Sequence, residues 1–151
     1  MTGMTRKQQH LESVLRTQPL PDGIHLRCWQ ATDFPAIQRL SDAQGWPMPA
    51  NRPEEALRSW EHSEPALVLY KQEQLIGFVR GLTDGEVTTY IAELLVDPAY
   101  RNESFGRLLL DVCHALHPHT RLDLIALAES SNFYKKSGFR DVGAGLRKSY
   151  R

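Results

Sequence analysis

The clearest pattern of apolar residues lies between residues 105 and 116. Its members recur at the spacing i, i+3, i+4, i+7, i+8 and i+11, which places their side chains on one face of a helix. They are Phe105, Leu108, Leu109, Val112, Cys113 and Leu116. Because proline removes a backbone donor, Pro118 predicts where this helix ends. The pattern therefore predicts a central helix with one buried face.

Weaker patterns predict shorter helices. The polar segment 1–22 carries one small apolar cluster, which predicts either a helix over about 6–16 or an extension of a domain that spans 23–151. Two further stripes are Phe34, Ile37 and Leu40, and Leu57 and Trp60. The expected N-caps are Thr32, Asn51, and Ser130 or Ser131 for a last short helix that ends at Gly138.

Short apolar runs between these helices predict strands. The expected strands are 24–29, 66–70, 75–81, 87–96, 122–127, 139–142 and 146–150. Turn residues at 72–73 and 84–85 join the second, third and fourth strands as hairpins. This order predicts one α/β domain, with a mixed, mostly antiparallel sheet and helices on both of its faces.

Composition narrows the class of protein. The chain has 18 basic and 18 acidic residues and a formal net charge of zero, so no general positive field favours nucleic acid or an anionic membrane. The two cysteines, Cys28 and Cys113, are expected to be buried free thiols in a reducing compartment. No run suits a signal peptide or a membrane span. A cytoplasmic protein is expected.

The stretch from Glu93 to Arg107 carries the main chemical signal. An apolar strand runs into Asp97-Pro98, a polar loop follows from 101 to 104, and the central helix then begins. The first amides of a helix have no partner within it, and the helix dipole favours negative charge there. Arg101 and Arg107 add positive charge on either side of the loop. The stretch predicts an anion-binding loop, although a plain strand-to-helix connection capped by Ser104 would have the same pattern.

Two motifs in this region resemble those of one family. The run from Arg101 to Gly106 resembles the pyrophosphate signature Arg/Gln-x-x-Gly-x-Gly/Ala of the GNAT acetyltransferases, and 133–139 resembles their Phe-Tyr-x-x-x-Gly-Phe run. Ser104 stands where the first glycine usually lies, and Leu127 where many members carry asparagine. The resemblance implies the GNAT fold, an N-acetyltransferase activity, acetyl-CoA as cofactor, and a homodimer.

By this resemblance, the cofactor lies along the strand end, the loop and the helix start. Backbone groups of Leu95 and Val96 would pair with the pantetheine arm, and Asn132 would hydrogen-bond it. The loop residues expected to bind the pyrophosphate are Arg101, Asn102, Glu103, Ser104, Phe105, Gly106 and Arg107.

Two side chains are candidates for proton transfer. Tyr134 occupies the tyrosine of the Phe-Tyr pair, and a phenol is protonated at neutral pH, so it can donate a proton to a leaving thiolate. Its alternative is packing with a local hydrogen bond. Glu93 lies among apolar residues on the strand before the loop, where a carboxylate can take a proton from an amine or bind the ammonium. Its alternative is a solvent-facing strand residue. Phe133 is expected in the core.

Substrate recognition is less specified. The loop 43–51, with Trp46 and Met48, lies where family members build the acceptor pocket, and Tyr90 could add a polar group. An aromatic, carboxylate-containing pocket would suit a cationic amine, with a small molecule as the first expectation and a peptide as the variant. The run His114, His117 and His119 lacks the ligands that complete a metal site, so no metal is expected.

Two function classes remain open from the sequence. The first is an enzyme that moves an acetyl group from acetyl-CoA to a primary amine by direct attack, since no cysteine lies in the catalytic stretch. The second is a non-catalytic acyl-CoA-binding or protein-interaction domain, because serine at position 104 would be strained if that position needs a positive φ.

Overall fold

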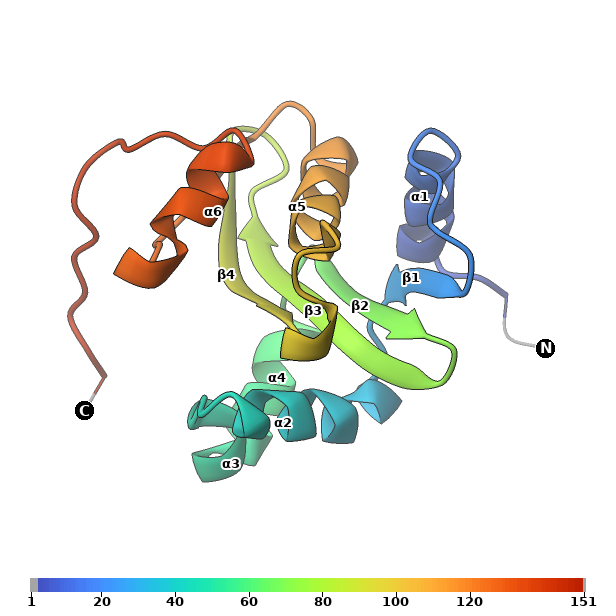
Figure 1. Cartoon of the computed structure of the whole chain (residues 1–151), viewed down its shortest axis with the longest axis horizontal. Helices are drawn as coiled ribbons and strands as arrows, with labels where there is room; N and C mark the ends of the chain where they lie inside the picture. The colour runs from blue at the N-terminus through green and yellow to red at the C-terminus, as the bar shows by residue number, and fades with distance from the viewer. Residues whose placement is uncertain (1–2, 151) are drawn as a thin grey trace.

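The computed structural model describes residues 3–150, which form a central sheet with helices above and below it (Figure 1). The strands are β1 (Ile24–Cys28), β2 (Ala66–Lys71), β3 (Gln74–Thr83), β4 (Thr88–Val96) and β5 (Arg121–Leu124). The helices are α1 (Arg6–Leu15), α2 (Phe34–Ala43), α3 (Met48–Asn51), α4 (Pro53–Glu61), α5 (Phe105–Leu116) and α6 (Ser131–Lys136). Short 3-10 turns are η1 (Ala31–Asp33), η2 (Pro98–Tyr100) and η3 (Ala128–Ser130).

The sheet confirms the predicted class. Its five strands lie in the order β1-β2-β3-β4-β5, with antiparallel pairs from β1 to β4 and a parallel pair between β4 and β5. The two predicted hairpins form, and Gln72 takes a positive φ of 54° in the first of them. A parallel pair needs a crossover, and α5 supplies it. Within 3–150, no helix has the length and apolar content to cross a membrane.

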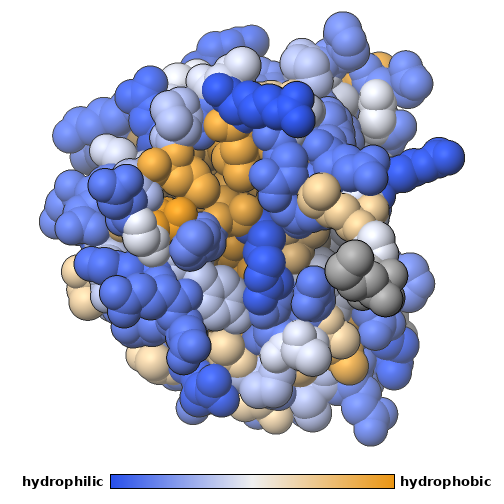
Figure 2. All heavy atoms as spheres, turned by 90° about the vertical axis from the view of Figure 1, so that its right-hand side faces the viewer, coloured by the Kyte–Doolittle hydropathy of each residue, from blue (hydrophilic) through white to orange (hydrophobic). Residues whose placement is uncertain are grey.

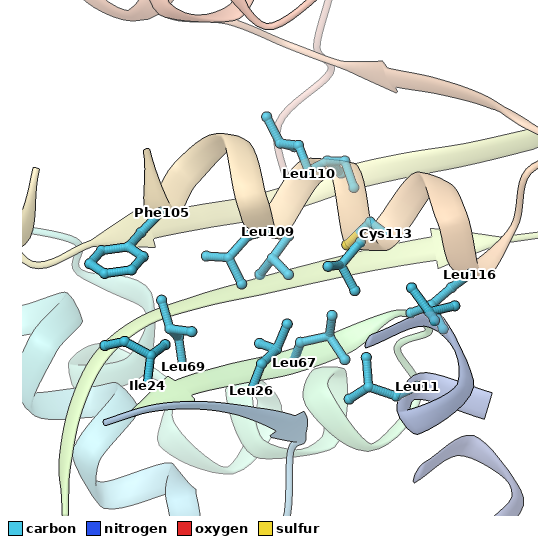
Figure 3. Packing of buried hydrophobic residues seen from close by; sticks show 14 of the residues in the cluster. Leu11, Ile24, Leu26, Leu67, Leu69, Phe105, Leu109, Leu110, Cys113 and Leu116 are labelled. Carbon is cyan, nitrogen blue, oxygen red and sulfur yellow. The ribbon is translucent and has the colours of Figure 1, made fainter. Parts of the chain in front are cut away.

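One core lies between the sheet and the pair α1 and α5. The stripe predicted for the central helix points into it, and Leu109, Val112 and Cys113 are fully buried. Figure 3 shows α5 side chains directed at residues of β1 and β2, with Leu11 of α1 beside them. Since Leu11 has no exposed surface, α1 packs onto the domain core.

A second core lies on the other face of the sheet, under α2 and α4. Trp60 and Phe78 are its largest buried side chains, and their rings meet at 5.5 Å between centroids. Trp29 is half-buried and packs on Trp60. Both faces of the sheet are therefore covered, as the apolar stripes predict.

The edge near α1 is open to solvent. Figure 2 shows apolar side chains gathered on the side of the molecule that α1, β1 and the β2–β3 hairpin form. A hollow there is lined by Leu15, Leu20 and Leu26, among others. It does not touch the polar loop between β4 and α5.

The C-terminal strands predicted at 139–142 and 146–150 are wrong. Residues 137–150 have no strand, and Val142 and Leu146 are 75% and 89% exposed. The strand expected over 122–127 is shorter and lies at the sheet edge, with its residues half-buried or exposed. In the described residues, β4 is the only strand that pairs with it.

The predicted helix caps are also corrected. Thr32 lies inside η1, and Asn51 ends α3 instead of starting α4. Ser130 is the N-cap of α6 but makes no side-chain cap hydrogen bond. Serine and threonine mark the start of a helix poorly when a 3-10 turn precedes it. The 3-10 turn already binds some of the backbone amides that a side-chain cap would otherwise bind.

Asp33 joins β1, η1 and β2 through one carboxylate. Arg27 donates to both of its oxygens at 2.8 and 2.6 Å, the Gln30 amide donates at 2.7 Å, and the Tyr70 hydroxyl donates at 2.8 Å. Burial alone would raise the pKa of Asp33, but these hydrogen bonds outweigh it and hold the pKa below its ordinary value. Burial and the bond to Asp33 raise the pKa of Tyr70 to about 12.

We expect Asp33→Ala to lower the free energy of unfolding by about 2–3 kcal/mol at pH 7, because it leaves several partly buried donors without their acceptor. The depressed pKa means that the carboxylate stabilises the fold above its unfolded pKa of about 4, and that this contribution is lost as pH falls further. Urea denaturation from pH 7 to pH 3 measures it. Asp111→Ala, at an exposed i,i+4 pair with Arg107, is the control. Equal losses in both variants would contradict the assignment.

Candidate functional site

The parallel strands β4 and β5 separate after a short pairing. β4 and β5 pair from Thr88–Arg121 to Ile91–Leu124, and β4 then continues alone to Val96. In the part of the chain that the structure describes, no strand lies beside residues 92–96 on that edge. Leu95 and Val96, predicted to act through their backbone, lie in this open stretch. Its free backbone groups can receive an extended chain.

A loop with two left-handed residues follows the open strand. The Asp97 carboxylate accepts from the Ala99 amide at 2.9 Å and holds the turn η2. Asn102 and Ser104 then have φ values of 71° and 65°. Asparagine tolerates this conformation, but serine at 104 is strained by about 1 kcal/mol. The sequence left open whether position 104 needs a positive φ, and the structure shows that it has one.

This backbone leaves the amides at the start of α5 without a hydrogen-bond acceptor within residues 3–150. Ser104 is the N-cap but makes no side-chain cap hydrogen bond, and the first backbone bond is from Leu108 N to Ser104 O at 2.9 Å. Among the described residues, no acceptor meets the amides of 102–107. Glu103 and the neighbouring loop side chains are exposed. The alternative of an ordinary serine cap is therefore not what the structure shows.

The two predicted arginines lie differently around this loop. Arg101 donates from Nε to the Val96 carbonyl at 3.1 Å and from a terminal nitrogen to Gln44 Oε1 at 3.1 Å. It thus links the open strand, the loop and the end of α2. Arg107 lies on the exposed face of α5, where its Nε is 3.6 Å from Asp111 Oδ2. Both guanidinium groups are accessible to an anion at the helix start.

Helix α6 lies beside α5 (Figure 1), and it carries the predicted Phe-Tyr pair. Tyr134 packs on Phe133 and Phe139 at ring distances of 5.0 and 5.6 Å. Burial raises its pKa, so the phenol stays protonated over a wide pH range. Phe133, expected in the core, is instead 38% exposed, and Asn132 is exposed.

Tyr134 also lines a cavity of about 750 Å³. The walls come from α5, β5, α6 and the segment after Gly138, and include Leu110, Ile125 and Phe139. The space adjoins the free edge of β5. It is the larger of the two hollows described for this molecule.

Glu93 is paired across the sheet. Its Oε2 lies 3.1 Å from Nε of Arg80, and Arg80 also donates to the Ser63 hydroxyl at 3.2 Å. Both side chains keep some exposed surface, 16% for Arg80 and 21% for Glu93. The sequence alternative of a solvent-facing glutamate does not describe this residue, which lies in a half-buried ion pair.

The two predicted proton-transfer residues lie on different faces of the sheet. Leu94 packs in the core beneath α5, whereas Leu95 packs in the core under α2 and α4. Side chains alternate along a strand, so Glu93 shares the face of Leu95. Tyr134 packs against the other core. Within residues 3–150, no hydrogen bond or ring contact joins Glu93 to Tyr134.

The predicted substrate residues lie near the Glu93 face or at the strand start. Trp46 packs on Phe78 at 6.2 Å in the second core, and Met48 is half-buried beside it. Tyr90 lies opposite Leu82 on β3 and Asp123 on β5. Neither of the two hollows described above is lined by Trp46 or Tyr90.

Sequence reasoning missed Arg80 and Gln44. A simple hairpin register would place Arg80 opposite Ala92, but a register shift between Arg80 and Gly81 places it opposite Glu93. Only the bulge reveals the ion pair, and a bulge has no strong sequence signal. Gln44 follows α2 in the loop already considered for the acceptor, so its neighbourhood, though not its contact, was predictable.

His114 and His117 have structural hydrogen-bond partners, and neither cysteine is activated. His114 Nε2 lies 3.0 Å from the Thr120 carbonyl, and His117 Nε2 lies 3.2 Å from Glu64 Oε1. Burial raises the pKa of Cys28 to about 11 and also raises that of Cys113. Both thiols are therefore weak nucleophiles.

Comparisons with known proteins agree with this geometry. A model of the GNAT acetyltransferase domain matches residues 62–141. Solved structures with the same fold include a GNAT family protein from Streptococcus pneumoniae TIGR4 (18% identity, 85% of this chain and 98% of that one, TM-score 0.69). Others are Ard1 from Thermoplasma volcanium (22%, 80% and 85%, TM-score 0.62) and glucosamine-6-phosphate N-acetyltransferase from Arabidopsis thaliana (15%, 85% and 99%, TM-score 0.62). No curated protein matches the sequence significantly.

We expect Ser104→Gly to raise the free energy of unfolding by about 1 kcal/mol, because glycine adopts this positive φ without strain. Chemical denaturation measures the change. Asn102→Gly is the matched control with a smaller expected gain, since asparagine tolerates the left-handed region. If Ser104→Gly gave no gain, the strain would not exist in solution.

Proposed function

The chain belongs to the GNAT acetyltransferase family, and on this premise we propose that it transfers the acetyl group of acetyl-CoA to the primary amine of a small molecule. The observation that carries the proposal is the open edge of β4, which leads directly to the uncapped start of α5. Free strand groups suit an extended amide-containing arm, and unpartnered helix amides suit a diphosphate. The open edge of β4 adjoins the start of α5, in the same order as the amide-containing arm and the diphosphate of acetyl-CoA.

The residues around the opening fit this donor. Backbone groups of Leu95 and Val96 would hold the pantetheine arm, with Asn132 on the α6 side. The amides of 102–107 would hold the diphosphate, because the structure gives them no other acceptor. Arg101 lies 3.1 Å from the Val96 carbonyl and could add a charge-assisted contact at this end of the strand.

Acetyl-CoA would supply the acetyl group as a thioester, and CoA would leave as the thiol. Tyr134 is the proposed proton donor to the leaving sulfur, since its raised pKa keeps the proton in place. A backbone amide of the open β4 edge would stabilise the negative charge on the carbonyl oxygen. Glu93 would bind the ammonium or accept its proton, directly or through water, from the opposite face of the sheet.

Direct attack by the amine is proposed, with both substrates bound together. Neither thiol suits a covalent route, because Cys113 is fully buried and burial raises the pKa of Cys28 to about 11. Trp46 and Tyr90 are the proposed acceptor residues. The Arg80–Glu93 pair gives the acceptor side no strong net charge, which favours a small amine over a polycationic peptide.

Calorimetric titration with acetyl-CoA and CoA tests the cofactor site. We expect micromolar binding by the wild type and about tenfold weaker binding by Arg101→Ala, because a charge-assisted contact contributes about 1.5–3 kcal/mol. Arg16→Ala, after α1, is the matched control and should bind as the wild type does. Absence of binding by the wild type, or equal affinity of Arg101→Ala and Arg16→Ala for the cofactor, would contradict the assignment.

Steady-state rates with a panel of amines test the proton-transfer roles. We expect Tyr134→Phe to lower kcat about 100-fold with little change in KM for acetyl-CoA, since positioned acid catalysis has this magnitude. Because the pKa of Tyr134 is raised, loss of this proton should not reduce the wild-type rate at any pH below 10. Glu93→Gln should lower kcat/KM for the amine. Tyr150→Phe, at an exposed tyrosine, is the control. Full kcat in Tyr134→Phe across pH would exclude it as the acid.

A further inference from the structure

The ring of Phe133 lies over the first turn of α5. A Cβ built on Gly106 would come within 2.8 Å of the Phe133 Cζ and 3.3 Å of its Cε1. The ring therefore approaches the backbone of Gly106 end-on, as close as a residue without a side chain allows. Its other recorded ring contact is Tyr134, at 5.0 Å. The Phe133 side chain keeps 38% of its surface exposed, so it is not locked into a core.

The turn that Phe133 covers is the one with the unpartnered amides. Gly106 is the second residue of α5, between Phe105 and Arg107, and its own surface is buried in this structure. The ring supplies part of that cover. An aromatic ring cannot accept hydrogen bonds from these amides as a phosphate does. The ring thus lies against the turn that carries these amides and offers them no acceptor.

We propose that Phe133 is a gate on the cofactor groove, which closes over the start of α5 when no cofactor is bound and moves aside to admit the diphosphate. The proposal rests on the proposed function of this turn as the diphosphate site. Helix α6 is suited to such movement, because it has only six residues and none of them is fully buried. A rotation of the Phe133 side chain or a displacement of α6 would each open the turn.

A gate of this kind lowers affinity by the fraction of molecules that are open. It acts on entry, so it slows association and leaves dissociation almost unchanged. It also couples entry to catalysis, since Tyr134 follows Phe133 on the same helix and its ring packs on that of Phe133. Opening the gate would reposition the proposed acid while the cofactor binds.

Stopped-flow and calorimetric measurement of acetyl-CoA binding tests the gate on the full chain. We expect Phe133→Ala to bind about three- to tenfold more tightly than the wild type, with the gain in the association rate and an unchanged dissociation rate. Phe133→Leu keeps part of the bulk and should lie between the two. Val87→Ala, at another exposed apolar residue far along the sheet, is the matched control and should bind as the wild type does. A melting curve for each variant confirms folding.

The outcomes separate the gate from the cofactor site. Wild-type binding that weakens in Arg101→Ala supports the site, whatever Phe133→Ala does. If Phe133→Ala then binds more weakly through faster dissociation, the ring contacts the bound cofactor and stabilises it, and the gate is overturned. Equal affinity of Phe133→Ala and the wild type also overturns the gate. If only Phe133→Ala binds, the gate is supported in its strongest form. If neither protein binds, both the site and the gate are contradicted.

Discussion

The early end of the pairing between β4 and β5 is the constraint on which the rest of the structure depends. Four residue pairs hold the strands together, and beyond Ile91 and Leu124 they separate. A continuous ladder would fill both sides of β4 and leave no free backbone. The separation leaves residues 92–96 open on one edge, next to the uncapped start of α5.

Two cores keep that opening in place. α5 is held by the buried stripe that includes Leu109 and Cys113, while α2 and α4 hold the other face through Trp60 and Phe78. These helices position the loop and the Glu93 face independently of the open edge. The elements that border the opening from outside, α6 and the segment after it, contribute little to either core. The site therefore combines a fixed strand and helix with a lightly held wall.

Periodicity predicted the elements that are buried on one side. The stripe of α5 and the hairpins around β3 have strong patterns, and they form as predicted. The strands at 139–142 and 146–150 do not form, because alternation alone does not supply a pairing partner. Within the site, the positive φ at Ser104 was predictable from its place in the loop. The Arg80–Glu93 pair depends on a bulge, and the Phe133–Gly106 contact on the placement of α6, so neither follows from local sequence.

The most direct test of the central claim is amide hydrogen exchange of the full chain with and without CoA. The account predicts that CoA slows exchange in two stretches, residues 92–96 on the open strand and 102–107 at the loop and helix start. It predicts no change in β1 and β2, which lie at the other side of the sheet. Protection confined to β1, β2 or α1, with none at 92–107, would show that the opening between β4 and β5 is not the cofactor site.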